Sequence, residues 1–186
     1  MKKIMFNDKY GLTQAVLEGR KTQTRRTFLK PGEENLLHGI TSEYLISVKS
    51  RYKVGETIAI AQSYKDIHAE VLREVGPWDL KKEFRQSKGY TNKMFVRAER
   101  MPHAIRITNI RVERLQDISE EDCLKEGIWR DENVGLEGTT YWYHGLANSS
   151  FRTPQEAYAS LIDRISGKGT WASNPYVFVY DFVLIN

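Results

Sequence analysis

Residues 104–115 read AIRITNIRVERL, a pattern typical of a long β-strand. Ile105 and Ile107 would lie on one face of such a strand, whereas Ile110 would lie on the other. A change of phase within one strand indicates a β-bulge, here near Thr108. Because a bulge bends the sheet that contains it, this stretch predicts a small, curved sheet.

Other stretches predict the neighbouring strands. Residues 176–185 are apolar on both faces, so they predict a strand in the middle of a sheet. Shorter strands are predicted at residues 2–6, 57–62 and 93–98, and one more around residues 44–48 within an otherwise aperiodic stretch.

Helices are predicted where apolar residues recur at helical spacing or where a capping sequence occurs. The spacing gives helices at residues 9–18 and 67–75 and a shorter one near residues 80–84. Capping sequences give a short helix within residues 119–127 and a longer helix after Thr153.

Together these elements predict an α+β fold in a single domain that spans residues 1–186. Residues 64–92, with two helices, and residues 130–152, an irregular loop, are expected to be insertions. The chain has no long apolar run, so no membrane-spanning helix is expected. Its single cysteine, Cys123, excludes an internal disulfide and is consistent with a cytoplasmic protein.

Charge is unevenly distributed along the chain. Residues 1–30 contain eight Lys and Arg against two acids, whereas residues 117–137 contain two against eight. A nonspecific nucleic-acid binder usually has broad positive charge. The sequence therefore favours a local basic surface for a small anion or a short single strand of nucleic acid. Alternatively, the two regions only neutralise each other.

The basic charge is densest in GRKTQTRR, residues 19–26, directly after the first predicted helix. Arg20 and Lys21 would lie near the C-terminus of that helix, where the helix dipole favours cations. Arg25 and Arg26 lie beyond the reach of the dipole, so they indicate a place where a polar or anionic group binds.

Three segments together resemble the ASCH domain family, most closely its bacterial and phage-associated members. They are residues 19–26, IRITNIRVERLQDISEEDCLKEGI at residues 105–128, and WASNPYVFVYDF at residues 171–182. The resemblance implies a PUA-like fold, which is a small, partly open β-barrel with helices packed beside it. It also implies RNA or a nucleoside-like ligand, bound in a cleft beside the barrel.

One small bacterial type within this family is an amidohydrolase that removes the acetyl group from acetylated cytidine. The resemblance implies that Lys21 is the proton acceptor, Thr24 the nucleophile and Glu126 the proton donor. Residues expected to bind the ligand are the other polar members of the octapeptide: Arg20, Thr22, Arg25 and Arg26.

The chemistry leaves two alternatives open. Catalysis needs a neutral Lys21 and a protonated Glu126, which burial and nearby charges favour. A salt bridge between the two would instead favour a non-catalytic module that binds RNA or nucleotides. In addition, many phage-type relatives have an Arg-Glu pair where this chain reads Ala61-Gln62-Ser63, so the ligand contacts are expected to differ.

Weaker signals come from aromatic and basic residues elsewhere. Residues 141–143, Tyr-Trp-Tyr, either stack on a base or anchor a long loop. Three arginines either extend an anion-binding face or only solubilise a strand: Arg106, Arg111 and Arg114. The four scattered His residues and one Cys have no metal-ligand spacing, so neither a metal nor a cofactor is expected.

Overall fold

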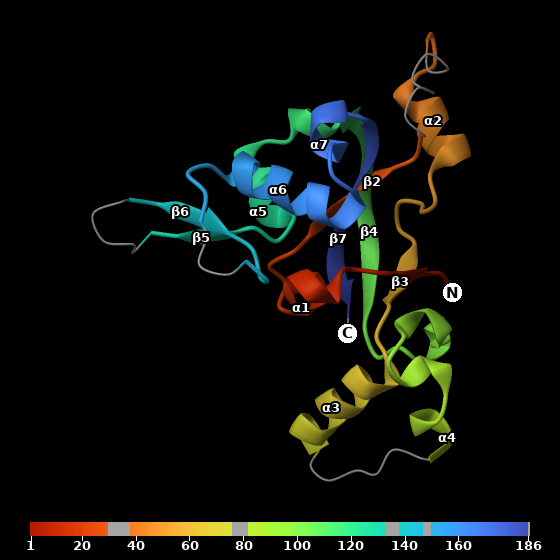
Figure 1. The fold of residues 1–186 in the computed structure, drawn as a ribbon. Helices are drawn as coiled ribbons and strands as arrows, with labels where there is room; N and C mark the ends of the chain where they lie inside the picture. Colours follow the sequence, from red (N-terminus) through yellow and green to blue (C-terminus); the bar gives the residue numbers. More distant parts are fainter. Residues whose placement is uncertain (30–37, 76–81, 133–137, 147–149, 186) are drawn as a thin grey trace. The chain divides into compact units, whose positions relative to one another are not determined.

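The computed structural model describes residues 1–29, 38–75, 82–132, 138–146 and 150–185 (Figure 1). A mixed five-stranded sheet, a separate two-stranded sheet and several helices confirm the α+β class. The strands are β1 (Lys3–Ile4), β2 (Gln23–Thr27), β3 (Thr57–Ile60), β4 (Ala104–Arg114), β5 (Trp129–Asp131), β6 (Thr140–Trp142) and β7 (Tyr176–Ile185).

The larger sheet has the strand order β1-β3-β4-β7-β2. β1 runs parallel to β3, whereas the pairs β3–β4 and β2–β7 are antiparallel. β7 has a neighbour on each side, as its apolar pattern predicted. In the described residues β1 and β2 form the two edges, so the sheet is open rather than a closed barrel.

Helices begin where the capping sequences predicted them. Ser119 accepts a hydrogen bond from the backbone N–H of Asp122 at the start of α5, and Thr153 forms a capping box with Glu156 at the start of α6. The α-helices are α1 (Leu12–Leu17), α2 (Ser42–Lys49), α3 (Tyr64–Val75), α4 (Lys82–Arg85), α5 (Glu120–Lys125), α6 (Pro154–Ser166) and α7 (Thr170–Ser173). The 3-10 turns are η1 (Asp8–Tyr10), η3 (Lys88–Tyr90), η4 (Lys93–Phe95), η5 (Ala98–Arg100) and η6 (Leu115–Asp117). Among the described residues, no helix combines the length and apolar character needed to cross a membrane.

The chain divides into two compact units. The first unit comprises Met1–Phe6, Thr57–Arg106 and Leu184–Asn186, and the second comprises Asn7–Glu56 and Ile107–Val183. The long strand β4 contributes residues to both. The expected insertion 64–92 belongs to the first unit and 130–152 to the second, although residues 76–81, 133–137 and 147–149 lie outside the described residues.

The first unit has a small apolar core around β3 and the segment that precedes β4. Its buried residues are Ala59, Ala61, Val96, Ala98 and Met101, against which Tyr64 and Ile67 pack.

Residues 93–98 are not the predicted strand but form η4 and the start of η5. Asn92 accepts a hydrogen bond from the N–H of Met94 and so caps the first turn. Lys3 Nζ donates to the carbonyl oxygens of Met94 at 2.6 Å and Val96 at 2.8 Å. These carbonyl oxygens would accept hydrogen bonds from a neighbouring strand if residues 93–98 were a strand. Because Lys3 occupies them, the predicted strand does not form.

The second unit buries one face of α6 against α5, α7 and β6. Ala157, Tyr158, Leu161 and Ile162 form that face, and each is buried, as the helical spacing after Thr153 predicted. Gly19, which follows the C-cap residue Glu18 of α1, has a φ of 73°, a left-handed conformation that ends the helix.

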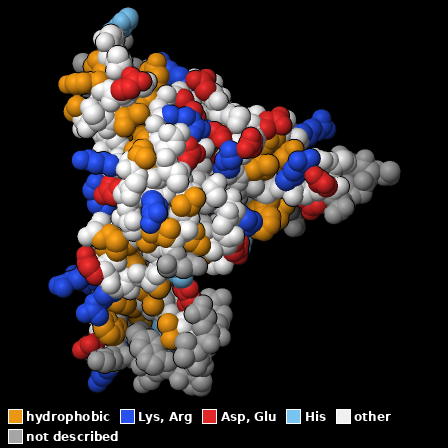
Figure 2. Space-filling view, turned by 180° about the vertical axis from the view of Figure 1, so that it is seen from behind, with side chains coloured by type: hydrophobic (Ala, Val, Ile, Leu, Met, Phe, Trp, Pro, Cys, Tyr) orange, Lys and Arg blue, Asp and Glu red, His pale blue; other side chains and the backbone are white. Residues whose placement is uncertain are grey.

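Residues 44–48 belong to α2, not to a strand. Thr41 accepts a hydrogen bond from the N–H of Tyr44 at 3.3 Å and caps the helix, and Leu45 is buried. Tyr44 and Val48 lie one helical turn apart and are exposed, and Figure 2 shows apolar side chains gathered over α2. The alternation was misleading because in so short a stretch the capping residue decides the conformation.

Two other elements differ from the prediction. The helix expected at residues 9–18 is interrupted at Gly11, whose φ of 63° separates η1 from α1. The loop expected at residues 130–152 contains β6, which pairs with β5. Trp129 and Trp142 pair across these strands with parallel rings, a cross-strand contact that stabilises the hairpin.

Candidate functional site

The basic octapeptide, residues 19–26, and the acidic segment that contains α5 meet in the second unit. β2 packs against α5, and the backbone N–H of Thr22 donates to the carbonyl oxygen of Lys125 at 3.0 Å. The two oppositely charged segments therefore lie in contact, and their charges compensate each other.

Lys21 and Glu126, which are 105 residues apart in the sequence, form a buried ion pair. Lys21 Nζ lies 2.5 Å from Glu126 Oε2 and also donates to the carbonyl oxygens of Gln23 at 2.7 Å and Glu126 at 2.8 Å. Only 2% of Lys21 and 4% of Glu126 is exposed. These contacts use the three donors of the ammonium group.

The turn after α5 brings Glu126 to this position. Gly127 follows it with a φ of 104°, a backbone conformation that other residues rarely adopt. A Cβ at Gly127 would also come within 3.2 Å of the Leu12 side chain. The glycine that the sequence predicted as the end of this helix is therefore also a condition for the ion pair.

Burial lowers the pKa of Lys21, because desolvation disfavours its charged form. Glu126 acts in the opposite direction, and the positive charges of Arg26 and Arg25 act in the same direction as burial. A lowered lysine pKa is what a proton acceptor needs, but buried structural pairs have it too.

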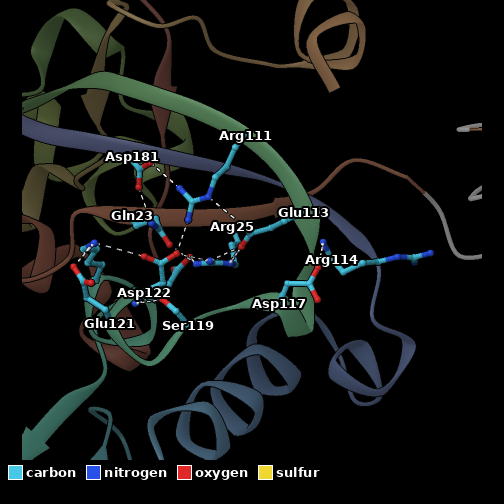
Figure 3. Close-up of polar contacts among 12 residues, drawn as sticks. Gln23, Arg25, Arg111, Glu113, Arg114, Asp117, Ser119, Glu121, Asp122 and Asp181 are labelled. Atoms are coloured by element: carbon cyan, nitrogen blue, oxygen red, sulfur yellow. Dashed lines mark hydrogen bonds and ion pairs between the residues drawn. The ribbon is translucent and has the colours of Figure 1, made fainter. Parts of the chain in front are cut away.

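Arg25 is the centre of a wider set of ionic contacts (Figure 3). Its Nη2 lies 2.5 Å from Glu113 Oε1 and 3.0 Å from Asp122 Oδ2, and its Nη1 lies 3.3 Å from Glu126 Oε1. Nη1 also donates to the side-chain oxygen of Gln23. The Arg25 side chain is completely buried, and these carboxylates balance its positive charge inside the protein.

Arg111, on β4, connects these acids to β7. Its guanidinium contacts Glu113 Oε2 at 2.9 Å, Asp181 Oδ2 at 2.8 Å and Asp122, as Figure 3 shows. Gln23 Nε2 donates to Asp181 Oδ1 at 2.6 Å. We call the whole set the ionic network: Lys21, Arg25, Arg111, Glu113, Asp122, Glu126 and Asp181.

Thr24 lies on the other face of β2. Side chains alternate along a strand, so Gln23 and Arg25 share the face that meets Glu126, whereas Thr24 points to the opposite face. The register between β2 and β7 agrees with this alternation. Gln23 is paired with Asp181 and donates a hydrogen bond to it, whereas Thr24 is paired with Tyr180. The structure thus brings Lys21 and Glu126 together, whereas Thr24 lies on the face of β2 opposite to Gln23 and Arg25.

The expected ligand-binding residues occupy three different environments. Arg20 pairs with Glu18 at 2.8 Å, and its guanidinium lies 3.7 Å from the centre of the Trp129 ring. Thr22 is half-buried, with its backbone bonded to α5 and β7. Arg25 is fully buried within the ionic network, and Arg26 is exposed.

An aromatic stack extends from Arg20 along the hairpin. Trp129 and Trp142 have ring centres 5.1 Å apart and planes only 5° from parallel. Both rings are half-buried, as is Tyr141, whereas Tyr143 is buried in the core. Tyr143 is thus a buried anchor, whereas Tyr141 and Trp142 are partly accessible to solvent.

The position at which many phage-type ASCH members, the family that the sequence resembles, have an Arg-Glu pair holds a polar cluster in the first unit. Gln62 Nε2 donates to Glu70 Oε2 at 3.2 Å, and Glu70 contacts His103. The side-chain oxygen of Gln62 is buried and has no hydrogen-bond partner among the described residues. Gln62 therefore has an unused acceptor where the family resemblance expects a charged pair.

Neither a metal ion nor a reactive thiol has a site among the described residues. No group of three His, Cys, Asp or Glu side chains within them could hold a metal. Cys123 is buried, and burial raises the pKa of its thiol to about 12, so it is not a thiolate nucleophile at neutral pH.

The ionic network makes stability sensitive to acid through Asp122. Burial raises the pKa of this carboxyl, but hydrogen bonds from Arg25 and Gln23 and the charge of Arg111 outweigh it and hold the pKa below its usual range. A carboxyl with a depressed folded-state pKa stabilises the protein above about pH 4, and the contribution is lost as the pH falls through the folded value.

We therefore expect Asp122→Asn to remove part of the acid dependence. Between pH 7 and pH 3, its free energy of unfolding should fall by about 1–2 kcal/mol less than that of the parent, the range for a hydrogen bond to a partly exposed charged group. Urea denaturation at both pH values measures this, with the exposed Glu120→Gln as a control that keeps the parent's dependence. An equal acid dependence in both variants would contradict the assignment.

The sequence identified part of this network. The basic octapeptide and the family resemblance pointed to Lys21, Arg25 and Glu126, but Glu113, Asp122 and Asp181 were not recognised. Arg111 was noted only as a member of an arginine face. An acid and a base two residues apart on one strand, as in Arg111 and Glu113, share a face and are the signal that would have found them.

Comparison of the chain with protein-family models, with curated proteins and with solved structures finds no match.

Proposed function

We propose that this chain is an ASCH-type protein with a PUA-like fold that binds a nucleobase, within RNA or a nucleoside, without chemical turnover. The observation that carries the proposal is the stack of Trp129 and Trp142 with Arg20 on the Trp129 ring. Bases stack on such rings whatever their sequence, and arginine adds an attraction for the base and its phosphate.

The open mixed sheet, the change of burial phase along β4 and the flanking helices are compatible with a PUA-like architecture. Ile105 and Ile107 are buried and so is Ile110, with two exposed residues between them, as a bulge in the strand would produce. These features support the family proposal together with the resemblance of the sequence.

The ionic network favours binding over catalysis. Lys21 has all three donors engaged and lies against a carboxylate, which is the arrangement of a structural ion pair. Thr24 lies on the face of β2 opposite to the one that meets Glu126, so strand register gives no support to Thr24 as the nucleophile of this pair.

Amide hydrolysis is the second candidate, and one observation favours it. The Lys21–Glu126 pair is buried, where low polarity disfavours both charges. Transfer of one proton from Nζ to the carboxylate would leave a neutral amine and a neutral acid. Those are the protonation states that a base and an acid need for this reaction.

Binding of a single-stranded 12-nucleotide RNA tests the proposal. We expect Trp142→Leu to weaken binding about 5- to 150-fold, because one lost base stack costs about 1–3 kcal/mol. Tyr44→Leu, which removes an exposed ring on α2 in the same unit, should leave the affinity unchanged. No binding by the folded parent, or equal affinity of Trp142→Leu and the parent, would overturn the proposal.

An assay for release of acetate from acetylated cytidine separates the two candidates. We expect no turnover by the parent. Turnover that is lost in both Lys21→Gln and Glu126→Gln would instead establish the hydrolase.

A further inference from the structure

The first unit contains a hollow of about 440 Å³ that is separate from every residue discussed above as a functional candidate. It lies within the segment from α3 to η5, and its walls come from α3, α4, η3, η4 and η5. Ligand pockets in proteins typically measure about 300–1,000 Å³, so the hollow is large enough for one small molecule.

Aromatic rings form part of the wall. Tyr64 and Phe84 pack with ring centres 4.8 Å apart, and Phe95 lines the same hollow. Phe95 leaves 57% of its surface exposed, which is unusual for so large an apolar side chain.

Gly89 allows this wall to form. A Cβ at this position would come within 2.8 Å of the Tyr64 ring, closer than real Cβ atoms approach, and within 3.1 Å of Val96, a tight contact. The backbone of η3 therefore lies directly against Tyr64 and fixes its ring beside Phe84. The wall is a packed feature of the unit and not a chance gap between side chains.

Positive charge surrounds the rings. Lys88, Arg97 and Arg100 line the hollow, against one acid, Glu83. Arg100 lies 5.1 Å from the centre of the Phe84 ring and Lys88 lies 5.7 Å from that of Phe95. Arg97 also interacts electrostatically with Glu99 outside the hollow, so Lys88 and Arg100, which lie over the rings, are the cations placed most directly for an anion.

We propose that this hollow binds a small anion that bears a planar ring, such as a nucleoside monophosphate or an aromatic carboxylate. The aromatic wall provides the surface for the ring, and Lys88, Arg97 and Arg100 pair with the phosphate or carboxylate. Glu83 accepts a hydrogen bond from an N–H or O–H group on the ring, which favours a polar ring over a purely hydrocarbon one. The site is independent of the proposed base stack in the second unit.

Calorimetric titration of the full chain tests the proposal with AMP and 4-hydroxybenzoate as probes. Adenosine has the ring but no anionic group, and inorganic phosphate has the anionic group but no ring, so the two serve as controls. We expect AMP or 4-hydroxybenzoate to bind, and the one that binds identifies the anion as phosphate or carboxylate. Adenosine and phosphate should bind at least about 10-fold more weakly, since each lacks half of the interactions.

Variants then locate the binding. Arg100→Gln and Phe95→Leu change exposed side chains and should each weaken binding about 5- to 10-fold, a modest loss because solvent and salt screen a charge at the rim. Lys65→Gln removes an exposed cation of α3 outside the hollow and should leave the affinity within about 2-fold. Trp142→Leu removes the proposed base stack of the second unit, so any AMP binding that this variant keeps belongs to the hollow.

Three results would overturn the proposal. The first is that neither AMP nor 4-hydroxybenzoate binds the folded parent. The second is that phosphate or adenosine alone binds as tightly as AMP. The third is that AMP binding is lost in Trp142→Leu and kept in Arg100→Gln, which would assign the nucleotide to the base stack of the proposed function instead.

Discussion

Glu126→Ala is expected to lower the free energy of unfolding by about 3–5 kcal/mol, the usual cost when one partner of a buried ion pair is removed. The substitution leaves the Lys21 ammonium buried without its carboxylate partner, beside the backbone carbonyl oxygens of Gln23 and residue 126. It also removes one of the carboxylates that neutralise Arg25. Urea denaturation at pH 7, followed by circular dichroism, measures the change.

Two comparisons separate the ion pair from a general effect of losing a glutamate. Glu121→Ala removes an exposed acid of α5 that pairs with Lys125, and it should cost less than about 1 kcal/mol. The double variant Lys21→Met/Glu126→Leu should recover most of the loss, because an apolar pair has no buried charge to compensate. If Glu126→Ala and Glu121→Ala cost the same, the buried pair has no special role in stability.

Arg25→Leu is the second substitution for which we expect a loss of about 3–5 kcal/mol. The completely buried guanidinium holds together Glu113, Asp122 and Glu126, and without it these carboxylates repel one another. Arg25→Lys should restore only part of the loss, since an ammonium group lacks the planar fork that contacts several acids at once. Arg26→Leu, at the exposed neighbouring position, is the matched control and should cost less than about 1 kcal/mol.

The pH dependence gives this prediction a second readout. Arg25 helps to lower the pKa of Asp122, and this stabilisation is lost as the pH falls through the folded-state value. The difference between Arg25→Leu and the parent should therefore shrink as the pH is lowered toward 3. A difference that stays constant with pH would mean that lost packing, and not charge, causes the destabilisation.

The two results together bear on function. If substitutions at Lys21, Arg25 and Glu126 lower the free energy of unfolding strongly, these residues mainly stabilise the fold, as expected of a binding module. A small cost at Glu126, together with turnover of acetylated cytidine, would favour the hydrolase, because catalytic groups are often held at the expense of stability.

Much of the local structure was predictable from the sequence, because its signals act over a few neighbouring residues. Ser119 and Thr153 start helices by bonding to N–H groups three residues away, and Gly19 ends one by adopting a left-handed conformation. The apolar pattern of residues 176–185 predicted an interior strand, because a strand that is apolar on both faces must be covered on both.

The errors occurred where two local signals compete or where a distant group decides. Residues 93–98 looked like a strand, but their carbonyl oxygens accept hydrogen bonds from Lys3, some 90 residues earlier in the chain. In α2, the cap at Thr41 outweighed a short alternation. The pairing of β5 with β6 includes a contact between Trp129 and Trp142, which are 13 positions apart. A pattern of neighbouring residues does not predict such a contact.

The sequence by itself determined the α+β class, the main helices, the interior strand and the opposition of a basic and an acidic segment. Those properties follow from periodicity, capping and composition, all of which are local. Only the tertiary structure decided that Lys21 pairs with Glu126 and that Arg25 pairs with three acids. It also decided that Thr24 lies on the face of β2 opposite to Arg25. Contacts between residues about 100 positions apart depend on strand register and on the turn at Gly127, because a shift of one residue would reverse every side chain of β2.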